Sequence, residues 1–288
     1  KAYASTPVGP TDGILVLIGQ FGGSDGLNVV VPYTNSTYYA QHGSIAIPAG
    51  QVLPLSNSVG LHPNLPYLKS LYDTGDVAVV QGVGYPDPDL SHFSSMAYWM
   101  YGHSGTGTPS TGWVGRWLDG MGGDDLFRAA SVGQGLPLHL IGANKRGTAV
   151  PQWGIGFGGD SRENDLWMYD AMRAFSATDA GRGPWHSSVA TTIKGVIDVG
   201  QQIGPVFDRP LPENDLEKKL TVVARLINAD LGLRVIDTGQ DGFDTHSGQP
   251  GGLISLMTDF DQALRAFYTT LDDRFRSRVT IMTYSEFG

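Results

Sequence analysis

The chain contains no cysteine, which excludes disulfide bonds, thiolate catalysis and cysteine-ligated zinc sites. It also has no run of lysine or arginine, and its formal net charge is −9 at pH 7. No basic surface is available to neutralise phosphates, so we expect neither nucleic acid nor an anionic membrane as a partner. An acidic chain can still bind phosphate esters where metal ions supply the positive charge.

Long hydrophobic runs are also missing. No apolar stretch reaches the length of a membrane span, so no membrane-spanning segment is predicted. No signal peptide is visible, and the chain starts at Lys1 with small and polar residues, as a processed mature terminus does. We therefore expect an exported protein that is periplasmic, cell-surface or extracellular.

Charged residues make up only 16% of the chain, whereas 41% is hydrophobic and 40 residues are glycine. Little charge with abundant glycine indicates long ordered loops around a sizeable core. The length of 288 residues suits a single α/β domain. Residues 103–185 hold many glycines and five of the six tryptophans, and we interpret them as an insertion or cap over the sheet edge.

Hydrophobic patterning predicts four strands separated by helices. Three apolar, β-branched runs are typical of buried strands, namely Ile14–Ile18, Val77–Val83 and Val279–Thr283. A shorter strand is expected at Leu233–Ile236, followed by a helix over about Leu253–Arg274. A strand, a crossover helix and a second strand form a βαβ unit, whose strands are parallel. The predicted fold is therefore α/β, with a mostly parallel sheet sandwiched between helices.

Each predicted strand runs into a loop that carries a carboxylate, and two of these loops also carry histidine. The loops read GGSDGLN, PDPDLSHF, DGFDTH and YSEFG. In a parallel sheet their candidate side chains meet at one edge; these are Asp25, Ser91, His92, Asp244, His246 and Glu286. Crowded carboxylates repel each other unless a cation lies between them. Mixed oxygen and nitrogen ligands suit zinc, manganese or iron, and oxygen ligands alone suit calcium or magnesium, so divalent metal ions are the expected cofactors.

Simpler roles stay open for these residues. Ser91 can be a helix cap, His92 a surface residue, and Asp25 or Asp244 a turn-forming residue. Residues 22–26 also fit G-x-S-x-G, the nucleophile-elbow pattern, in which Ser24 would serve a serine esterase. Against that, the motif follows the first strand, and Asp244 lies too close to His246 in sequence for those two to complete a triad. A non-catalytic binding or surface-assembly protein on the same fold is a further alternative.

The blocks GGSDGLNVVVPY, GLHP, VAVVQGVGYPDPDLSHF, GFDTH and SEFG, in this order, resemble an uncharacterised bacterial family, domain of unknown function 1501. The resemblance covers nearly the whole chain. The family is grouped with the alkaline phosphatase and sulfatase superfamily and is often exported by the twin-arginine route. The resemblance implies a large parallel sheet with two metal ions at its carboxyl edge, and hydrolysis of a phosphate or sulfate ester of a small molecule or polymer.

By this resemblance Asp25 matches the acid that holds one metal, and Asp244 and His246 match the cluster of the other. Glu286 stands where the superfamily often has Asp followed by His, and Ser91 is the only hydroxyl near the expected nucleophile position. The chain departs from the pattern at Glu286, and around Ser91. The family continues past SEFG with a further Asp-His-Gly block, so we expect the functional unit to extend beyond Gly288.

Overall fold

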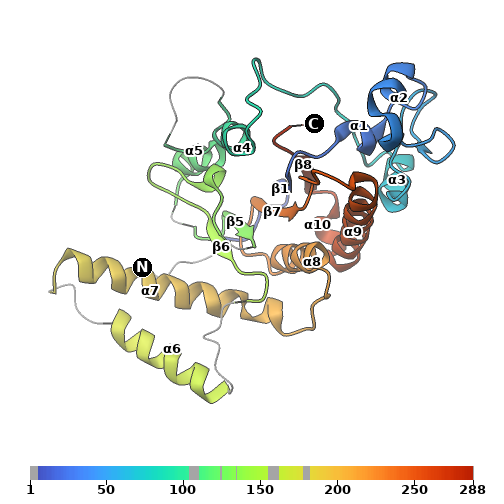
Figure 1. Cartoon of the computed structure of the whole chain (residues 1–288). Coiled ribbons are helices and arrows are strands. Elements are labelled where there is room, and N and C mark those ends of the chain that lie inside the picture. Colours follow the sequence, from blue (N-terminus) through green and yellow to red (C-terminus); the bar gives the residue numbers. More distant parts are fainter. Residues whose placement is uncertain are drawn as a thin grey trace.

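Among the residues that the structure describes, five strands form the central sheet, in the order β6-β5-β7-β1-β8, and every neighbouring pair runs parallel. This computed structural model describes residues 6–103, 110–123, 125–133, 135–154, 162–177 and 182–287. The strands are β1 (Ile14–Phe21), β5 (Ala129–Val132), β6 (Thr148–Val150), β7 (Val235–Asp241) and β8 (Val279–Tyr284). Their carboxyl ends share one edge (Figure 1). The predicted α/β architecture, with a mostly parallel sheet between helices, is confirmed.

β1 lies inside the sheet, between β7 and β8. Its sequence ILVLIGQF is apolar and β-branched, and the strand is buried on both faces, which is what parallel sheets require. Leu17 pairs with Asp237 of β7 on one side and with Met282 of β8 on the other. This register brings the loops that follow the three strands together at the carboxyl edge.

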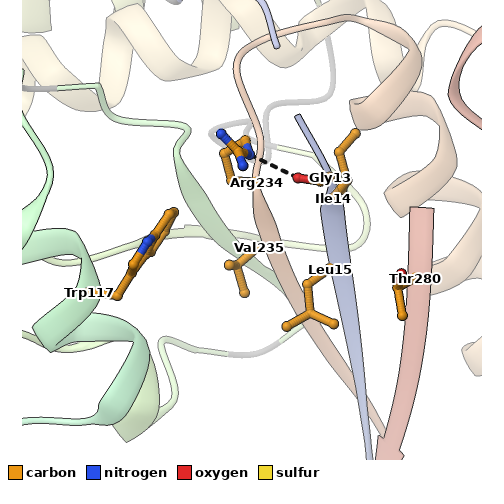
Figure 2. Close-up of a pocket in the computed structure, with 7 residues that line it drawn as sticks. All are labelled: Gly13, Ile14, Leu15, Trp117, Arg234, Val235 and Thr280. Carbon is orange, nitrogen blue, oxygen red and sulfur yellow. Dashed lines mark hydrogen bonds between the residues drawn. The ribbon is translucent and has the colours of Figure 1, made fainter. Parts of the chain in front are cut away.

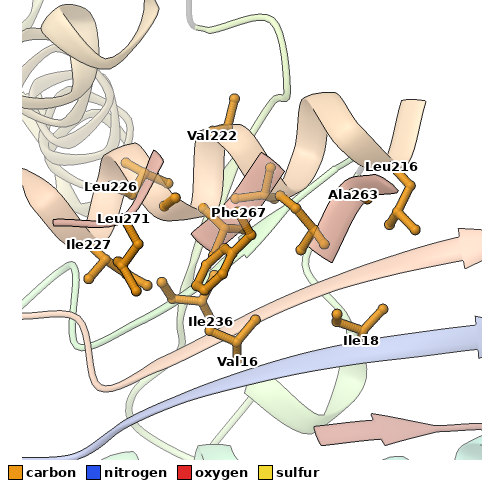
Figure 3. Packing of buried hydrophobic residues seen from close by; sticks show 14 of the residues in the cluster. Val16, Ile18, Leu216, Val222, Leu226, Ile227, Ile236, Ala263, Phe267 and Leu271 are labelled. Carbon is orange, nitrogen blue, oxygen red and sulfur yellow. The ribbon is translucent and has the colours of Figure 1, made fainter. Parts of the chain in front are cut away.

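Two long helices cover one face of the sheet. They are α8 (Asp215–Asn228) and α9 (Gln249–Thr270). Both carry apolar residues at three-to-four spacing, so each presents one hydrophobic stripe to the strands. Phe267 of α9 is fully buried in the same cluster as Val16 of β1 and Ile236 of β7 (Figure 3). α3 (Pro66–Asp73) packs against the outer side of α9.

The other face is covered over β5 and β7 by shorter elements. These are α4 (His92–Tyr101), α5 (Trp113–Gly120) and the 3₁₀ turn η2 (Leu138–Leu140). Near the amino ends of the strands this cover is incomplete and leaves an open pocket of about 350 Å³ between Leu15, Trp117 and Thr280. Figure 2 shows Arg234 at this pocket, donating from Nε to the Gly13 carbonyl oxygen at 2.8 Å. The pocket lies at the end of the strands opposite to the predicted site.

The remaining elements flank this core. A small antiparallel sheet has the order β2-β4-β3 and is built from β2 (Val30–Val31), β3 (Leu53–Pro54) and β4 (Gly60–Leu61). Short helical elements are α1 (Gly26–Val29), α2 (Ser36–His42), η1 (Gly43–Ile45), η4 (Gly204–Phe207) and α10 (Asp273–Arg276). The helices α6 (Arg162–Ser176) and α7 (Pro184–Ile203) lie side by side, away from the carboxyl edge (Figure 1).

The predicted strand at Val77–Val83 is wrong: the segment belongs to no strand, and Val80 and Val83 are 76% and 62% exposed. The glycine- and tryptophan-rich stretch 103–185 supplies β5 and β6 to the central sheet, so at least this part of it belongs to the main layer. Some residues of that stretch lie outside the described ranges. No helix in the described ranges combines the length and the apolar character that a membrane span needs.

Candidate active site at the carboxyl edge

Four of the predicted side chains form a continuous chain of contacts beyond the ends of β1, β7 and β8. Nδ1 of His92 lies 2.9 Å from Oε1 of Glu286, and Nε2 of His92 lies 3.7 Å from Oδ1 of Asp244. The other carboxylate oxygen of Asp244 lies 2.9 Å from Nε2 of His246. Carboxylate and imidazole therefore alternate along the cluster, which we call the acid–imidazole chain. The sequence prediction that these four residues converge agrees with this geometry.

Glycine at two positions makes this convergence possible. Gly22 has φ +112° and approaches the Phe243–Asp244 backbone so closely that a Cβ would lie 2.2 Å from the amide nitrogen of Asp244. A Cβ on Gly23, which has φ +75°, would lie 2.7 Å from the ring of Phe287. Only a residue without a side chain fits such positions. The two glycines therefore allow the loop after β1 to lie in close contact with the loops after β7 and β8.

Glu286 is the buried end of the acid–imidazole chain. Its side chain is 4% exposed, and Oε1 also accepts a hydrogen bond of 2.7 Å from the Gly22 backbone N–H. Burial alone would raise the pKa of this carboxyl. Hydrogen bonds from its own backbone, His92, Gly22 and Gly23 outweigh burial and leave the pKa below its ordinary value. Glu286 is therefore ionised at neutral pH and holds the Nδ1 side of His92.

The outer end of the acid–imidazole chain faces solvent. The side chain of His246 is 82% exposed and that of Asp244 is 46% exposed, whereas that of His92 is 39% exposed. His246 has a left-handed backbone with φ +46°. A ligand can reach Asp244 and His246 directly, while His92 sits between them and the buried Glu286.

α4 fixes the position of Glu286 and His92. Ser95 Oγ and Trp99 Nε1, both on α4, donate hydrogen bonds to the main-chain oxygen of Glu286. The His92 ring packs against Phe287, with ring centroids 4.8 Å apart. His92 is the first residue of the helix, and Ser91 is its N-cap. The hydroxyl of Ser91 makes no capping bond, and within the described ranges no hydrogen bond ties it to the acid–imidazole chain.

Asp25 lies in a different set of contacts. It caps α1 by accepting from the Asn28 backbone, and its Oδ2 accepts from Asn28 Nδ2 at 2.8 Å and from Gln249 Nε2 at 2.5 Å. Nε2 of His42 lies 3.4 Å from its Oδ1. His42 could not be chosen from the sequence, because 17 positions separate it from Asp25. We find no hydrogen bond or ion pair between Asp25 and the acid–imidazole chain in the described ranges.

Ser24 is placed beside the same edge. Its backbone N–H donates to Ser285 Oγ at 2.9 Å, and its own hydroxyl is buried without a hydrogen-bond partner in the described part of the chain. The neighbouring Gly23 lies against the His92 ring, since a Cβ there would be 3.6 Å from Cε1 of His92. A buried hydroxyl without a hydrogen bond lowers the stability of the fold, which makes Ser24 a candidate functional residue.

A second carboxylate–imidazole pair lies deeper in the sheet. Nε2 of His139 is 3.1 Å from Oδ1 of Asp237, and the Tyr284 hydroxyl donates to the same oxygen at 3.2 Å. Burial raises the pKa of both Asp237 and Tyr284. All three side chains lie between the sheet and η2, and Tyr284 immediately precedes Ser285 and Glu286. The sequence did not indicate this pair.

The donors of the acid–imidazole chain pair with each other rather than surround one point. Within the described ranges, no group of three or more His, Asp or Glu side chains is arranged to hold a metal ion.

No family model matches this chain, and neither the curated proteins nor the solved structures include one with significant similarity. The geometry of the edge is therefore the basis for any functional assignment.

Proposed function

We propose that this chain is an exported, metal-dependent hydrolase of phosphate or sulfate esters, related to domain of unknown function 1501 and to the alkaline phosphatase and sulfatase superfamily. One observation carries the proposal: two carboxylates and two imidazoles are in continuous contact at the carboxyl edge of a parallel sheet, where α/β proteins bind their ligands. Such a set of titratable groups in mutual contact is typical of functional sites.

The chemistry of the donor set fits a divalent ion. Asp244 offers two oxygens to neighbouring imidazoles, and mixed oxygen and nitrogen ligands suit zinc or manganese. Asp244, His246 and His92 would hold the ion, and Glu286 would orient His92 through Nδ1, as outer-shell carboxylates commonly do. Bringing three donors onto one ion requires side-chain rotation, which the exposure of His246 permits.

The ion would supply positive charge to the ester oxygens and would lower the pKa of the attacking group. The chain's own residues would do the rest. His92, fixed by the ionised Glu286, can donate or accept a proton at Nε2 on the solvent side of the site. The attacking group would be Ser91, which directly precedes His92, or a water molecule.

The test combines metal binding with hydrolysis. Zn²⁺ and Mn²⁺ are titrated into the purified protein by calorimetry, and hydrolysis of p-nitrophenyl phosphate, bis-p-nitrophenyl phosphate and p-nitrophenyl sulfate is followed with and without EDTA. Asp244→Asn and His246→Gln should weaken metal binding by about tenfold or more, in line with the loss of a ligand or its support. Asp273→Asn, at a carboxylate on α10 that is 94% exposed, is the matched control and should bind as wild type does. Absence of metal binding by the wild-type chain would sink the proposal.

A serine esterase is the second candidate, because Ser24 lies at the same edge and the neighbouring Gly23 lies against the His92 ring. The structure offers a base and an orienting acid other than Asp244 and His246, because His92 is held by Glu286 at 2.9 Å. Nucleophile, base and carboxylate would then be Ser24, His92 and Glu286, the roles of a catalytic triad.

A fluorophosphonate probe separates the two candidates. An esterase would be labelled at Ser24, would lose labelling in Ser24→Ala, and would hydrolyse p-nitrophenyl acetate in the presence of EDTA. The metal-dependent hydrolase would show none of this. Ser24→Ala would leave its metal affinity unchanged, whereas Ser24→Ala in an esterase would abolish turnover.

A further inference from the structure

α7 carries one apolar stripe along its length, of which the rest of the described chain covers only the last part. Its positions are separated by four and three residues in turn, as in the seam of a coiled coil: Trp185, Val189, Thr192, Val196, Val199 and Ile203. Val199 and Ile203 are buried in the main core, whereas Trp185, Val189 and Val196 are 86%, 48% and 38% exposed. The first half of α7 extends away from the sheet (Figure 1), so the stripe continues past its cover.

α6 adds a second apolar stripe to the same side. The two helices pack together, with Phe175 of α6 against His186 of α7 at a ring distance of 5.5 Å. The less exposed positions mark the contact: Tyr169 and Met172 on α6, and Ala190, Ile193 and Ile197 on α7. On both helices, the exposed stripe lies one residue before these contact positions. α6 supplies Met168, Ala171 and Phe175.

The two stripes face the same way because α6 and α7 run in opposite directions. A side chain one position earlier in a helix points about 100° around the helix axis from the side chain that follows it. When two antiparallel helices are viewed along their common axis, this rotation is clockwise in one helix and counter-clockwise in the other. Because their contact sides face each other, both stripes then lie on the same side of the pair. We call this side the apolar face; it contains the stripe of α6 and Trp185, Val189, Thr192 and Val196 of α7.

On α7, the opposite side of the helix pair is polar. On α7 the positions that follow the contact positions are Ser187, Thr191, Lys194 and Asp198, and Lys194 bonds Asp198 at 2.7 Å. On the apolar face, the hydroxyl of Thr192 donates to the Ser188 carbonyl oxygen at 2.9 Å, so it has an acceptor within its own helix. This contrast between two exposed sides indicates that one of them has a partner.

We propose that the apolar face binds the same face of a second copy of this chain, forming a four-helix bundle about a two-fold axis. The stripe on α7 is self-complementary: in an antiparallel pairing, Trp185 meets Val196 of the second copy, and Val189 meets its Thr192.

The available area is consistent with a dimer. With aromatic side chains burying about 150–250 Å² each, the exposed parts of Trp185 and Phe175 amount to roughly 260 Å², about a third of what each partner in a stable complex buries. Met168, Val189 and Val196 add to this. The net charge of −9 disfavours the alternative of an anionic lipid surface. The proposal does not depend on which reaction the carboxyl edge catalyses.

Sedimentation velocity of the full chain over about 1–100 μM tests the proposal. Wild-type protein should dimerise, and Val189→Glu and Val196→Glu should each raise the dimer dissociation constant about tenfold or more, because each buries a carboxylate against apolar side chains. Thr191→Glu, one helical step away on the polar side, should dimerise like wild type. Circular dichroism and the melting temperature of the monomers establish that each variant folds.

The absence of cysteine allows a second readout that needs no destabilising change. Mixing the Val189→Cys and Thr192→Cys variants under mild oxidation should give a disulfide-linked heterodimer, and mixing Ser187→Cys with Thr191→Cys should not. A monomer at all concentrations, or a dimer that neither glutamate variant weakens, overturns the proposal. So does flotation of a monomeric wild-type protein with phosphatidylcholine vesicles that Val189→Glu abolishes, since the face would then bind lipid.

Discussion

Nδ1 of His92 lies 2.9 Å from Oε1 of Glu286, although 194 positions separate the two residues in the chain. The contact joins the start of α4 to the loop after β8. Ser95 and Trp99 reinforce it by binding the main-chain oxygen of Glu286. Helix, loop and imidazole therefore form one unit, and changes at Glu286 should affect stability and the site together.

Glu286→Gln should lower the free energy of unfolding by about 1–2 kcal/mol at pH 7, because it removes a buried charged acceptor. The pKa of Glu286 in the folded chain lies below its ordinary value of 4.5, so the carboxylate stabilises the fold above about pH 4.5. That stabilisation is lost as the pH falls through the lower, folded-state pKa. Urea unfolding from pH 7 to pH 3 should show wild type and variant converging, while the exposed Glu213→Gln follows wild type throughout.

His62 should make the protein less stable in mild acid. Its side chain is 1% exposed, and burial lowers its pKa from 6.5 to about 4. Between these values the unfolded chain binds a proton that the folded chain does not, so the free energy of unfolding falls as the pH drops from 6.5 to about 4, by up to about 3 kcal/mol.

His62→Asn tests this assignment, because an amide oxygen can replace Nδ1 as acceptor for the Asn64 backbone N–H. The variant should be less stable than wild type at pH 7, since it leaves a small cavity. Its unfolding free energy should change less between pH 7 and pH 5. An unchanged pH dependence would show that His62 is not the group responsible.

Asp261 should be important for holding α3. This residue of α9 is 5% exposed, and its two carboxylate oxygens accept from the backbone N–H groups of Tyr67 and Leu68 at 3.0 and 2.9 Å. Asp261→Ala leaves both donors of the first turn of α3 without this acceptor and should cost about 2–3 kcal/mol. Gln262→Ala, at the exposed next position, should cost less than about 0.5 kcal/mol. Chemical denaturation measures both.

Gly22→Ala should damage the site more than the same change at another left-handed glycine. Both Gly22 and Gly75 have positive φ, of +112° and +84°, but a Cβ on Gly75 meets nothing within 4 Å, whereas one on Gly22 meets the Asp244 backbone. Gly75→Ala should therefore show only the conformational cost of about 1 kcal/mol. Gly22→Ala should lose about 2–4 kcal/mol. An amide NMR spectrum that leaves Asp244 unmoved in Gly22→Ala would contradict the close approach.

The sequence predicted the parts of the fold that have a strong local pattern. The expected strand Ile14–Ile18 lies within β1, and the helix expected over about Leu253–Arg274 corresponds to α9. Val279–Thr283 lies within β8, but β8 is an edge strand that is partly exposed rather than buried as predicted. Val77–Val83 has the same β-branched, apolar composition as β1, yet it forms no strand. Strand formation depends on a pairing partner elsewhere in the chain, which composition alone does not reveal.

For the site as well, the sequence indicated residues that follow a local pattern and missed those brought together by tertiary packing. His92, Asp244, His246 and Glu286 could be expected together because each follows a segment that leads to one sheet edge, although the segment before His92 proved not to be a strand. His42 and Gln249, which contact Asp25, could not be expected, since only tertiary packing brings α2 and the start of α9 to that residue. Membership of a metal site, for Asp25 as for the others, remains a prediction.

The central position of β1 has a consequence for how the chain reaches its fold. Leu15 pairs with Val235, and Ile14 pairs with Val279, so the first strand to be synthesised needs neighbours that come from the far end of the sequence. At the usual pace of translation these neighbours follow on the order of ten to fifty seconds later. For that time a nascent chain carries an exposed ILVLI segment, the kind of sequence that aggregates when unpaired. Such long-range pairing also slows refolding, so a nascent-chain binding chaperone is expected to increase the yield of native protein.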